Sequence, residues 1–453
     1  MPSVGHGIEC FCPPGQGGRL MRMRLFRCVP VVLCIIVLAW FLPRNYLRAA
    51  KGERWMISGQ YSPVTEDFII WESNASGFAF RTIDGKEYPS LRARRLMPFL
   101  FYNDVLKHNG FPLTIGGRSF DYKDAARNHT FRLSPSTIFE RHNHLHFLME
   151  SSPQTANLTM PDSLMIINRD KVRFIDCTTG KEEPEKGRRF TRTLRDSGVV
   201  FPIKLSATNT NVRKKFDEGM LLVDANKTLF HLKQIRGVPW CHNLGNTFEG
   251  TPLFINVDEN VRREYYGQLV TDTNIYLVSY SRGLIRLPLS DYEAATSIIK
   301  VWNMPVFQTL VLQNTDINLP TRLIAVDESW RIRAEHAEPT PKAVLEHQQW
   351  VNYGLSMISP FRYVLHLPHK PGTIFSLVLA PCWPLALATC LICVIAYLIA
   401  TRRRFSSFWD TRRLCQQGLE IGIIMVSGLP GLIALLLFGP LVSTLPTPIS
   451  HPK

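Results

Sequence analysis

The sequence has few cysteines where a disulfide-stapled domain would need them. Of its ten cysteines, only Cys177 and Cys241 lie between residues 48 and 372. A small fold held together by disulfides needs a denser set. The pattern leaves two alternatives open, a pair of free thiols or one Cys177–Cys241 bridge.

Catalytic signatures are also missing. The chain contains no Gly-x-Ser-x-Gly elbow, no Cys–His pair at a recognised spacing and no phosphate-binding loop. The glycine-rich stretch from Thr114 to Phe120 lacks the Lys-Ser/Thr pair of a nucleotide loop and predicts a β-turn instead. We therefore expect a non-enzymatic protein that needs no cofactor.

The net charge of +15 does not indicate a nucleic-acid partner once the basic residues are located. One basic group precedes an apolar run and consists of Arg22, Arg24 and Arg27. A second group lies between two apolar runs and consists of Arg402, Arg403, Arg404, Arg412 and Arg413. Basic residues that flank membrane segments report topology first. We expect the second group to contact lipid headgroups or to dock a cytoplasmic protein.

Three apolar runs predict three transmembrane helices in contact with the lipid bilayer. The runs are 28–42, 374–400 and 421–442, and about 20 apolar residues cross a bilayer. The first run could also be a cleaved signal peptide, but no small-x-small site follows it. The positive-inside rule then places the N-terminus in the cytoplasm and the long central region outside it.

These observations divide the chain into seven segments. We expect a disordered or mis-assigned start (1–24), an N-terminal anchor (25–47), an extracytoplasmic β-rich domain (48–372), a transmembrane helix (373–400), a cytoplasmic Arg-rich loop (401–418), another transmembrane helix (419–443) and a short outer tail (444–453).

The central region is predicted to be mainly β. Apolar–polar alternations separated by turn residues form five similar stretches, which begin at residues 77, 164, 219, 274 and 322. Recurring hairpins at about 40–50 residues are typical of propeller blades. An incomplete or divergent propeller is therefore favoured over a sandwich or an irregular β domain. Between the first two hairpins, the stretch 90–112 predicts a helix, with Phe99, Phe101 and Tyr102 in the core.

Several phrases, in the same order along residues 55–370, resemble an uncharacterised family of bacterial membrane proteins. They include "LMPFLFYNDVLKHNGFP", "LHFLMESSPQTANLTMPDSLMIINRDKVRFID" and "FTRTLRDSGVVFPIKLSATNTNVRKKFDEG". The family is a domain of unknown function with an N-terminal anchor, a large extracytoplasmic region and C-terminal spans. Its members look like components encoded beside ABC-type exporters. The resemblance implies the inner membrane, a periplasmic central domain, and ABC permease and ATPase subunits as partners. This chain departs from the family where "ATNTN" replaces a Gly-Asn-Pro-Thr-like turn.

Three histidines form the candidate metal site. His142, His144 and His146 are spaced so that they share one face of a strand, which is the geometry of a zinc patch. The alternative is a solvated or packed polar strand face. A metal-dependent hydrolase would rest on these residues alone. We favour an accessory or substrate-handling subunit of an ABC-type transport complex over an extracytoplasmic ligand-binding or sensor module, and both over the hydrolase.

The stretch from Phe216 to Trp240 carries acids, a histidine and a lysine among apolar residues. It predicts one hairpin, in which His231 lies in a mixed row of side chains and has a structural role. Asp217 and Glu218 precede Gly219 and are expected to cap exposed amides at the turn.

Overall fold

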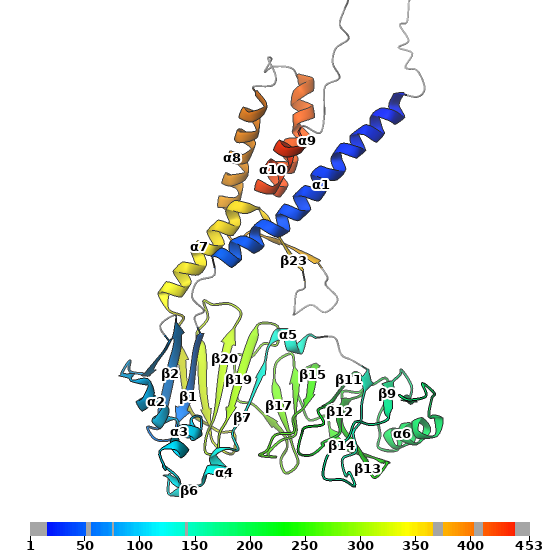
Figure 1. Ribbon diagram of the computed structural model, residues 1–453, viewed down its shortest axis with the longest axis vertical. Coiled ribbons are helices and arrows are strands. Elements are labelled where there is room, and N and C mark those ends of the chain that lie inside the picture. Colours follow the sequence, from blue (N-terminus) through cyan, green and yellow to red (C-terminus); the bar gives the residue numbers. More distant parts are fainter. Residues whose placement is uncertain are drawn as a thin grey trace, which may run out of the picture. The chain divides into compact units, whose positions relative to one another are not determined.

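The computed structural model describes residues 16–50, 56–74, 77–140, 144–365, 375–402 and 411–439 (Figure 1). The chain divides into two compact units. The β unit takes the described residues within 53–341, and the helical unit takes those before 53 and after 341.

The β unit is built from antiparallel sheets, five of which have three or more strands within the described residues. Sheet A has the order β1-β2-β3-β4 (Met56–Ser62, Asp67–Asn74, Gly77–Thr82, Glu87–Tyr88). Sheet B has the order β22-β21-β20-β19-β7 (Ile332–Glu338, Thr321–Val326, Gln308–Asn314, Ser297–Asn303, His129–Leu133). Sheet C has the order β15-β16-β17-β18 (Pro252–Val257, Gly267–Thr271, Ile275–Ser279, Gly283–Arg286). Sheet D has the order β11-β12-β13-β14 (Leu205–Thr208, Met220–Val223, Leu229–Ile235, Val238–Gly245). Sheet E has the order β10-β9-β8 (Val172–Asp176, Ser163–Ile167, Leu145–His146).

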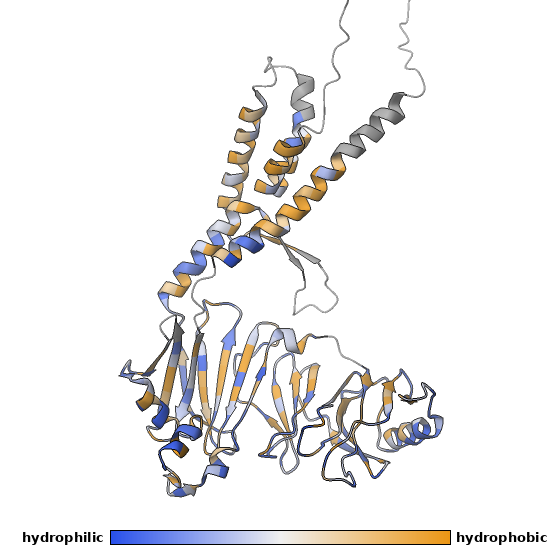
Figure 2. Cartoon of the chain, viewed as in Figure 1, coloured by the Kyte–Doolittle hydropathy of each residue, from blue (hydrophilic) through white to orange (hydrophobic). Residues whose placement is uncertain are grey.

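The sheets pack face to face, so inner strands are buried on both faces. In β17, Ile275 and Leu277 join the core shared with sheet B, whereas Tyr276 and Val278 join the core shared with sheet D. Side chains of a strand alternate between its faces, and here each face meets another sheet. Strands such as β12 and β17 are consequently apolar at nearly every position, as the hydropathy colouring shows (Figure 2).

The expected mainly β architecture is confirmed, and all five predicted hairpins form. They are β3–β4, β9–β10, β12–β13, β17–β18 and β21–β22. Their regular spacing does not mark equivalent positions, because β12–β13 are the middle strands of sheet D whereas β17–β18 end sheet C. The strands form separate open sheets and no closed barrel among the described residues.

The insert after β4 holds two short helices where one was predicted. α2 (Ser90–Leu96) ends before Pro98, and α3 (Tyr102–Lys107) begins after it. A proline lacks the amide hydrogen that a continuing helix needs and restricts the residue before it. Met97 accordingly adopts φ −119° and ψ 60°. Phe99 lies in the core as expected, whereas Phe101 and Tyr102 are only partly buried.

The predicted turn between Thr114 and Phe120 is a tight hairpin of β5 (Leu113–Ile115) and β6 (Arg118–Phe120). Gly116 and Gly117 have φ of 56° and 73°, which suits a two-residue hairpin turn. Three further helices belong to this unit. They are α4 (Tyr122–Ala125), α5 (Pro135–Ile138) and α6 (Pro184–Asp196), the last of which packs Phe190 and Leu194 into the core of sheets D and E.

The helical unit combines segments that precede and follow the β unit in the sequence. Its elements are α1 (Gln16–Ala49), α7 (Lys342–Ile358), β23 (Phe361–Leu365), β24 (Phe375–Leu379), α8 (Trp383–Arg402), α9 (Thr411–Ser427) and α10 (Leu429–Phe438). A core that includes Val31, Tyr397, Ile424 and Leu435 joins α1, α8, α9 and α10. α1 already includes residues 16–24 of the segment expected to be disordered, and residues 1–15 lie outside the described part.

Within the described residues, two helices, and not the three predicted, are long and apolar enough to cross a membrane. These segments are Cys28–Ala49 and Trp383–Thr401. The third predicted span is broken at Gly428, which has φ 67°, into the shorter α9 and α10. Pro430 follows two residues later and cannot donate the hydrogen bond that would continue α9. The second apolar run is also shortened, because it begins with strand β24.

Candidate functional site

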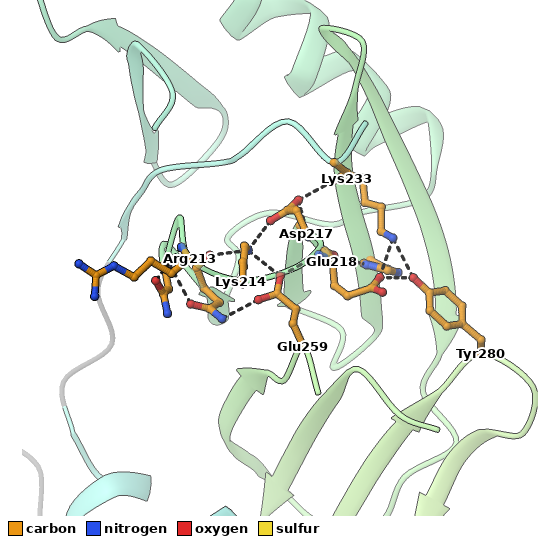
Figure 3. A network of polar contacts seen from close by, with 12 residues as sticks. Arg213, Lys214, Asp217, Glu218, Lys233, Glu259 and Tyr280 are labelled. Atoms are coloured by element: carbon orange, nitrogen blue, oxygen red, sulfur yellow. Dashed lines mark hydrogen bonds and ion pairs between the residues drawn. The ribbon is translucent and has the colours of Figure 1, made fainter. Parts of the chain in front are cut away.

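A buried ion-pair network joins sheets C and D (Figure 3). At its centre, the Lys214 Nζ atom lies 2.5 Å from an Asp217 oxygen and 2.6 Å from a Glu259 oxygen. These three side chains are 4%, 1% and 1% exposed. Lys214 and Asp217 precede β12 in sheet D, whereas Glu259 follows β15 in sheet C. The network therefore links two sheets by charge.

The two central carboxylates accept further hydrogen bonds. Glu259 accepts the backbone N–H of Glu218 at 2.8 Å and the side-chain amide of Asn209 at 2.5 Å. Asp217 accepts the hydroxyl of Ser151 at 2.5 Å and the backbone N–H of Gly219 at 2.9 Å. Burial raises the pKa of Glu259, and the hydrogen bond from Lys214 opposes that rise. Both carboxylates thus have the partners that buried charges require.

A second cluster lies beside the first. The Lys233 Nζ atom donates to Glu218 at 2.6 Å and to the Tyr280 hydroxyl oxygen at 2.8 Å, and that hydroxyl donates to the same carboxylate. Burial, followed by the hydrogen bond to Glu218, raises the pKa of Tyr280. Lys233 comes from β13 and Tyr280 follows β17, so this cluster also connects sheets D and C.

His231 is packed between the same two sheets. Its side chain is 1% exposed and stacks on Tyr266, with 4.7 Å between the ring centroids. Its Nε2–H donates to the carbonyl oxygen of Glu218 at 2.6 Å. Burial lowers the pKa of His231 to about 4, so the ring is neutral at pH 7. A neutral ring in this position contributes packing and one hydrogen bond.

The prediction for the two acids at the turn is half right. Asp217 accepts the Gly219 amide as expected, but the Glu218 side chain binds Lys233 and Tyr280. Sequence reasoning missed Lys214 and Glu259, which are 45 residues apart. A charged pair at that separation leaves no periodic signal in a sequence. In the turn between β12 and β13, Lys227 has a positive φ of 61°.

The network holds its charges in fixed pairs. Each carboxylate is bound to an ammonium or hydroxyl group, and neither ammonium lacks a partner. No group of three or more metal-ligating side chains occurs within the described residues. The arrangement supports a structural role, in which the ion pairs stabilise the contact between sheets C and D. It contains no nucleophile paired with a base.

The candidate zinc histidines are only partly described. His142 lies outside the described residues. His144 is exposed, whereas His146 is buried. The Nε2 atom of His146 lies 2.9 Å from the Ser206 hydroxyl oxygen, and its Nδ1 atom lies 3.4 Å from the Thr208 hydroxyl oxygen. His146 is thus held by hydroxyl groups of sheet D.

The two cysteines of the β unit are free thiols in the structure. Cys177 is exposed just after β10, whereas Cys241 packs against the core beneath α6. Burial raises the pKa of the Cys241 thiol to about 11, so it is protonated and unreactive at neutral pH.

The basic group of the predicted cytoplasmic loop spans the end of one helix and the start of another. Arg402 ends α8, and Arg412 and Arg413 lie in the first turn of α9. Arg403 and Arg404 lie outside the described residues.

The β unit also contains a cavity of about 410 Å³ beside the insert. It lies within the range of small-molecule sites, roughly 300–1,000 Å³. Residues from α2, α3 and the β5–β6 hairpin line it, including Leu91, Arg94, Arg95, Val105, Leu113 and Ile115. The lining is mainly apolar and carries two guanidinium groups and one carboxylate, that of Asp104. This combination suits a ligand with both an apolar and an anionic part.

Comparison with known proteins assigns a family to the β unit. No curated protein and no solved structure matches the chain. One family does, and its match begins within β1 and ends within β21, so it covers most of the β unit, leaves out β22, and includes none of the helical unit. Matched over residues 59–322, the chain belongs to the family described as a domain of unknown function (DUF4857).

Proposed function

We propose that this protein is a membrane-anchored accessory subunit of an ABC-type transport complex, with its β unit on the extracytoplasmic side of the inner membrane. The observation that carries this proposal is the exposure of apolar side chains on α1 and α8. In the most apolar stretch of each helix, only 11% (α1) and 22% (α8) is buried within the protein. Such surfaces need lipid or partner helices around them.

The connectivity supports the same conclusion. Segments on both sides of the family domain, α1 before it and α8 to α10 after it, share one apolar core. The β unit is therefore tethered at both ends to a single helical unit, as expected of a domain presented at a membrane surface. The link to ABC-type subunits rests on the resemblance of the sequence phrases to exporter-associated proteins.

The fold of the β unit fits a binding role without catalysis. We take the face-to-face sheets to be a divergent, open propeller, because sheets C and D are each four consecutive antiparallel strands. Faces and loops of such repeats commonly carry binding surfaces.

Purification of the tagged full-length protein from its native membrane in mild detergent tests this proposal. Mass spectrometry of the eluate should identify permease and ATPase subunits in fixed ratio to the tagged chain. A matched purification of a helical-unit chain without residues 53–341 distinguishes contacts made by the helices from contacts made by the β unit. Recovery of the full-length protein as a lone monomer would contradict the proposal.

A second candidate function is an extracytoplasmic ligand-binding or sensor module, favoured by the 410 Å³ cavity. It predicts that a ligand raises the melting temperature of the β unit without any partner subunit. A ligand effect that appears only in the assembled complex would favour the accessory-subunit function instead.

A further inference from the structure

The cavity beside the insert combines an apolar wall with an excess of positive charge. Its apolar lining includes Val64 and Leu91, which are 53% and 59% exposed although both are large aliphatic side chains. An apolar ligand that covers exposed aliphatic side chains on a concave surface removes their area from water, and this burial favours binding.

The charged side chains of the cavity are not balanced within the protein. Arg94 pairs with Asp104 at 3.1 Å, whereas Arg95 has no carboxylate partner among the described residues. The Nε atom of Arg94 is buried without a hydrogen-bond partner in the part of the chain that the structure describes. His108 also lines the cavity. The cavity therefore has one carboxylate for two guanidinium groups. The second guanidinium group is available to the carboxylate of a ligand, because guanidinium groups bind carboxylates well.

A second cavity in the same unit shows the contrasting case. It has a volume of about 260 Å³ and is lined mainly by polar residues. Two of its arginines, Arg118 and Arg262, already form ion pairs with Glu328 and Glu264. The arginines of that cavity are paired with carboxylates, whereas Arg95 has no carboxylate partner among the described residues.

We propose that the cavity between α2, α3 and the β5–β6 hairpin binds a small anionic amphiphile, such as a medium-chain carboxylate, with its carboxylate at Arg95 and its chain along Leu91, Val105, Leu113 and Ile115. The proposal extends the proposed function by naming a ligand class for the β unit. Because its readout is local labelling, it does not depend on any transport partner. Failure to co-purify with transporter subunits would leave it untouched, and failure of labelling would leave the transport function untouched.

Photoaffinity labelling of the full-length protein in neutral phosphatidylcholine nanodiscs tests this binding. The probe is a decanoic acid that carries a diazirine, and the comparison probe is the corresponding alcohol. Peptide mass spectrometry should locate the label of the acid within residues 91–115, and excess unlabelled decanoate should remove it. The alcohol should label the same peptides much less.

Matched variants separate recognition of charge from a general effect on folding. Arg95→Gln should lower labelling by up to about fivefold, the range expected for one partly exposed ion pair. Arg92→Gln removes the same charge from the same helix but should leave labelling unchanged, because Arg92 lies over the Tyr88 ring and does not line the cavity. Thr114→Trp should fill the cavity and abolish labelling while the melting temperature stays that of the wild type.

Three results would overturn the proposal. The first is a label that lies only in the helical unit. The second is an alcohol that labels residues 91–115 as strongly as the acid does. The third is equal labelling of Arg95→Gln and Arg92→Gln. If Thr114→Trp lowers the melting temperature, the comparison of Arg95→Gln with Arg92→Gln still decides the outcome.

Discussion

The ammonium group of Lys214 lies 2.6 Å from the carboxylate of Glu259, and both side chains are almost wholly buried. Lys214 precedes β12 of sheet D and Glu259 follows β15 of sheet C, so this pair links the two sheets. Taking two charges out of water costs several kcal/mol unless each finds good partners. The pair is stable here because backbone and amide donors complete the hydrogen bonding of Glu259.

Replacement of Lys214 by Met should destabilise the β unit by about 3–5 kcal/mol, since it leaves two buried carboxylates without their ammonium group. Denaturant unfolding of the full-length protein, followed by tryptophan fluorescence, measures the change. Lys215→Met is the matched control because Lys215 is exposed, and it should change stability by less than about 0.5 kcal/mol. Adding Asp217→Asn and Glu259→Gln to Lys214→Met should recover part of the loss. Equal stability of the two lysine variants would show that the network does not hold the sheets together.

Stability should fall on mild acidification because of His231. Its pKa in the folded protein is lowered to about 4 from the ordinary 6.5, so the unfolded chain binds the extra proton at higher pH. The neutral ring therefore contributes stability that is fully present above pH 6.5 and is lost as the pH falls toward 4. The linked loss is at most about 3 kcal/mol.

Unfolding of His231→Gln, compared with the wild type at pH 7.5 and 4.5, checks this linkage. The variant should be less stable at pH 7.5 but should lose less stability on acidification. His242→Gln is the control, since His242 pairs with His231 across the β13–β14 ladder and its side chain is exposed. An identical pH dependence in the wild type and His231→Gln would be evidence against the linkage.

Gly219 should tolerate no side chain. It has φ 71°, and a Cβ atom there would lie 2.4 Å from the carbonyl oxygen of Leu232. Gly237 has φ 73° but open space around it. Both alanine variants incur the cost of a left-handed residue, about 1–2 kcal/mol, and only Gly219→Ala adds a clash with backbone.

We therefore expect a clearly larger loss of melting temperature for Gly219→Ala than for Gly237→Ala. Circular dichroism melts of the two purified variants provide the measurement. Similar losses would indicate that the strand pair β12–β13 shifts to relieve the contact.

The proposed location of the β unit outside the cytoplasmic membrane can be tested with its own cysteines. Cys177 is exposed, whereas burial raises the pKa of Cys241 to about 11. A membrane-impermeant maleimide added to intact spheroplasts should label Cys177 and leave Cys241 unmodified. Cys177→Ser should remove the label from the β unit. Labelling of Cys177 only after lysis would place the β unit in the cytoplasm and contradict the proposed topology.

The sequence alone determined the local elements of this protein. Alternating apolar residues and turn residues predicted the hairpins, and Gly116–Gly117 predicted the tight β5–β6 turn, because these signals act over a few residues. The apolar runs at 28–42 and 374–400 predicted two membrane-length helices, and the structure has such helices at 28–49 and 383–401. The prediction of a third span was wrong, because a glycine at φ 67° and a nearby proline end α9.

Only the tertiary structure decided which sheets stack and which charges pair. Strands buried on both faces are apolar throughout, so their sequences do not state which sheet covers which face. Lys214 and Glu259 meet only because sheets C and D pack together. The cavity at Arg95 likewise requires two helices and a hairpin from separate parts of the insert. Burial of charge and the shape of a cavity depend on contacts between distant segments, and no local pattern encodes them.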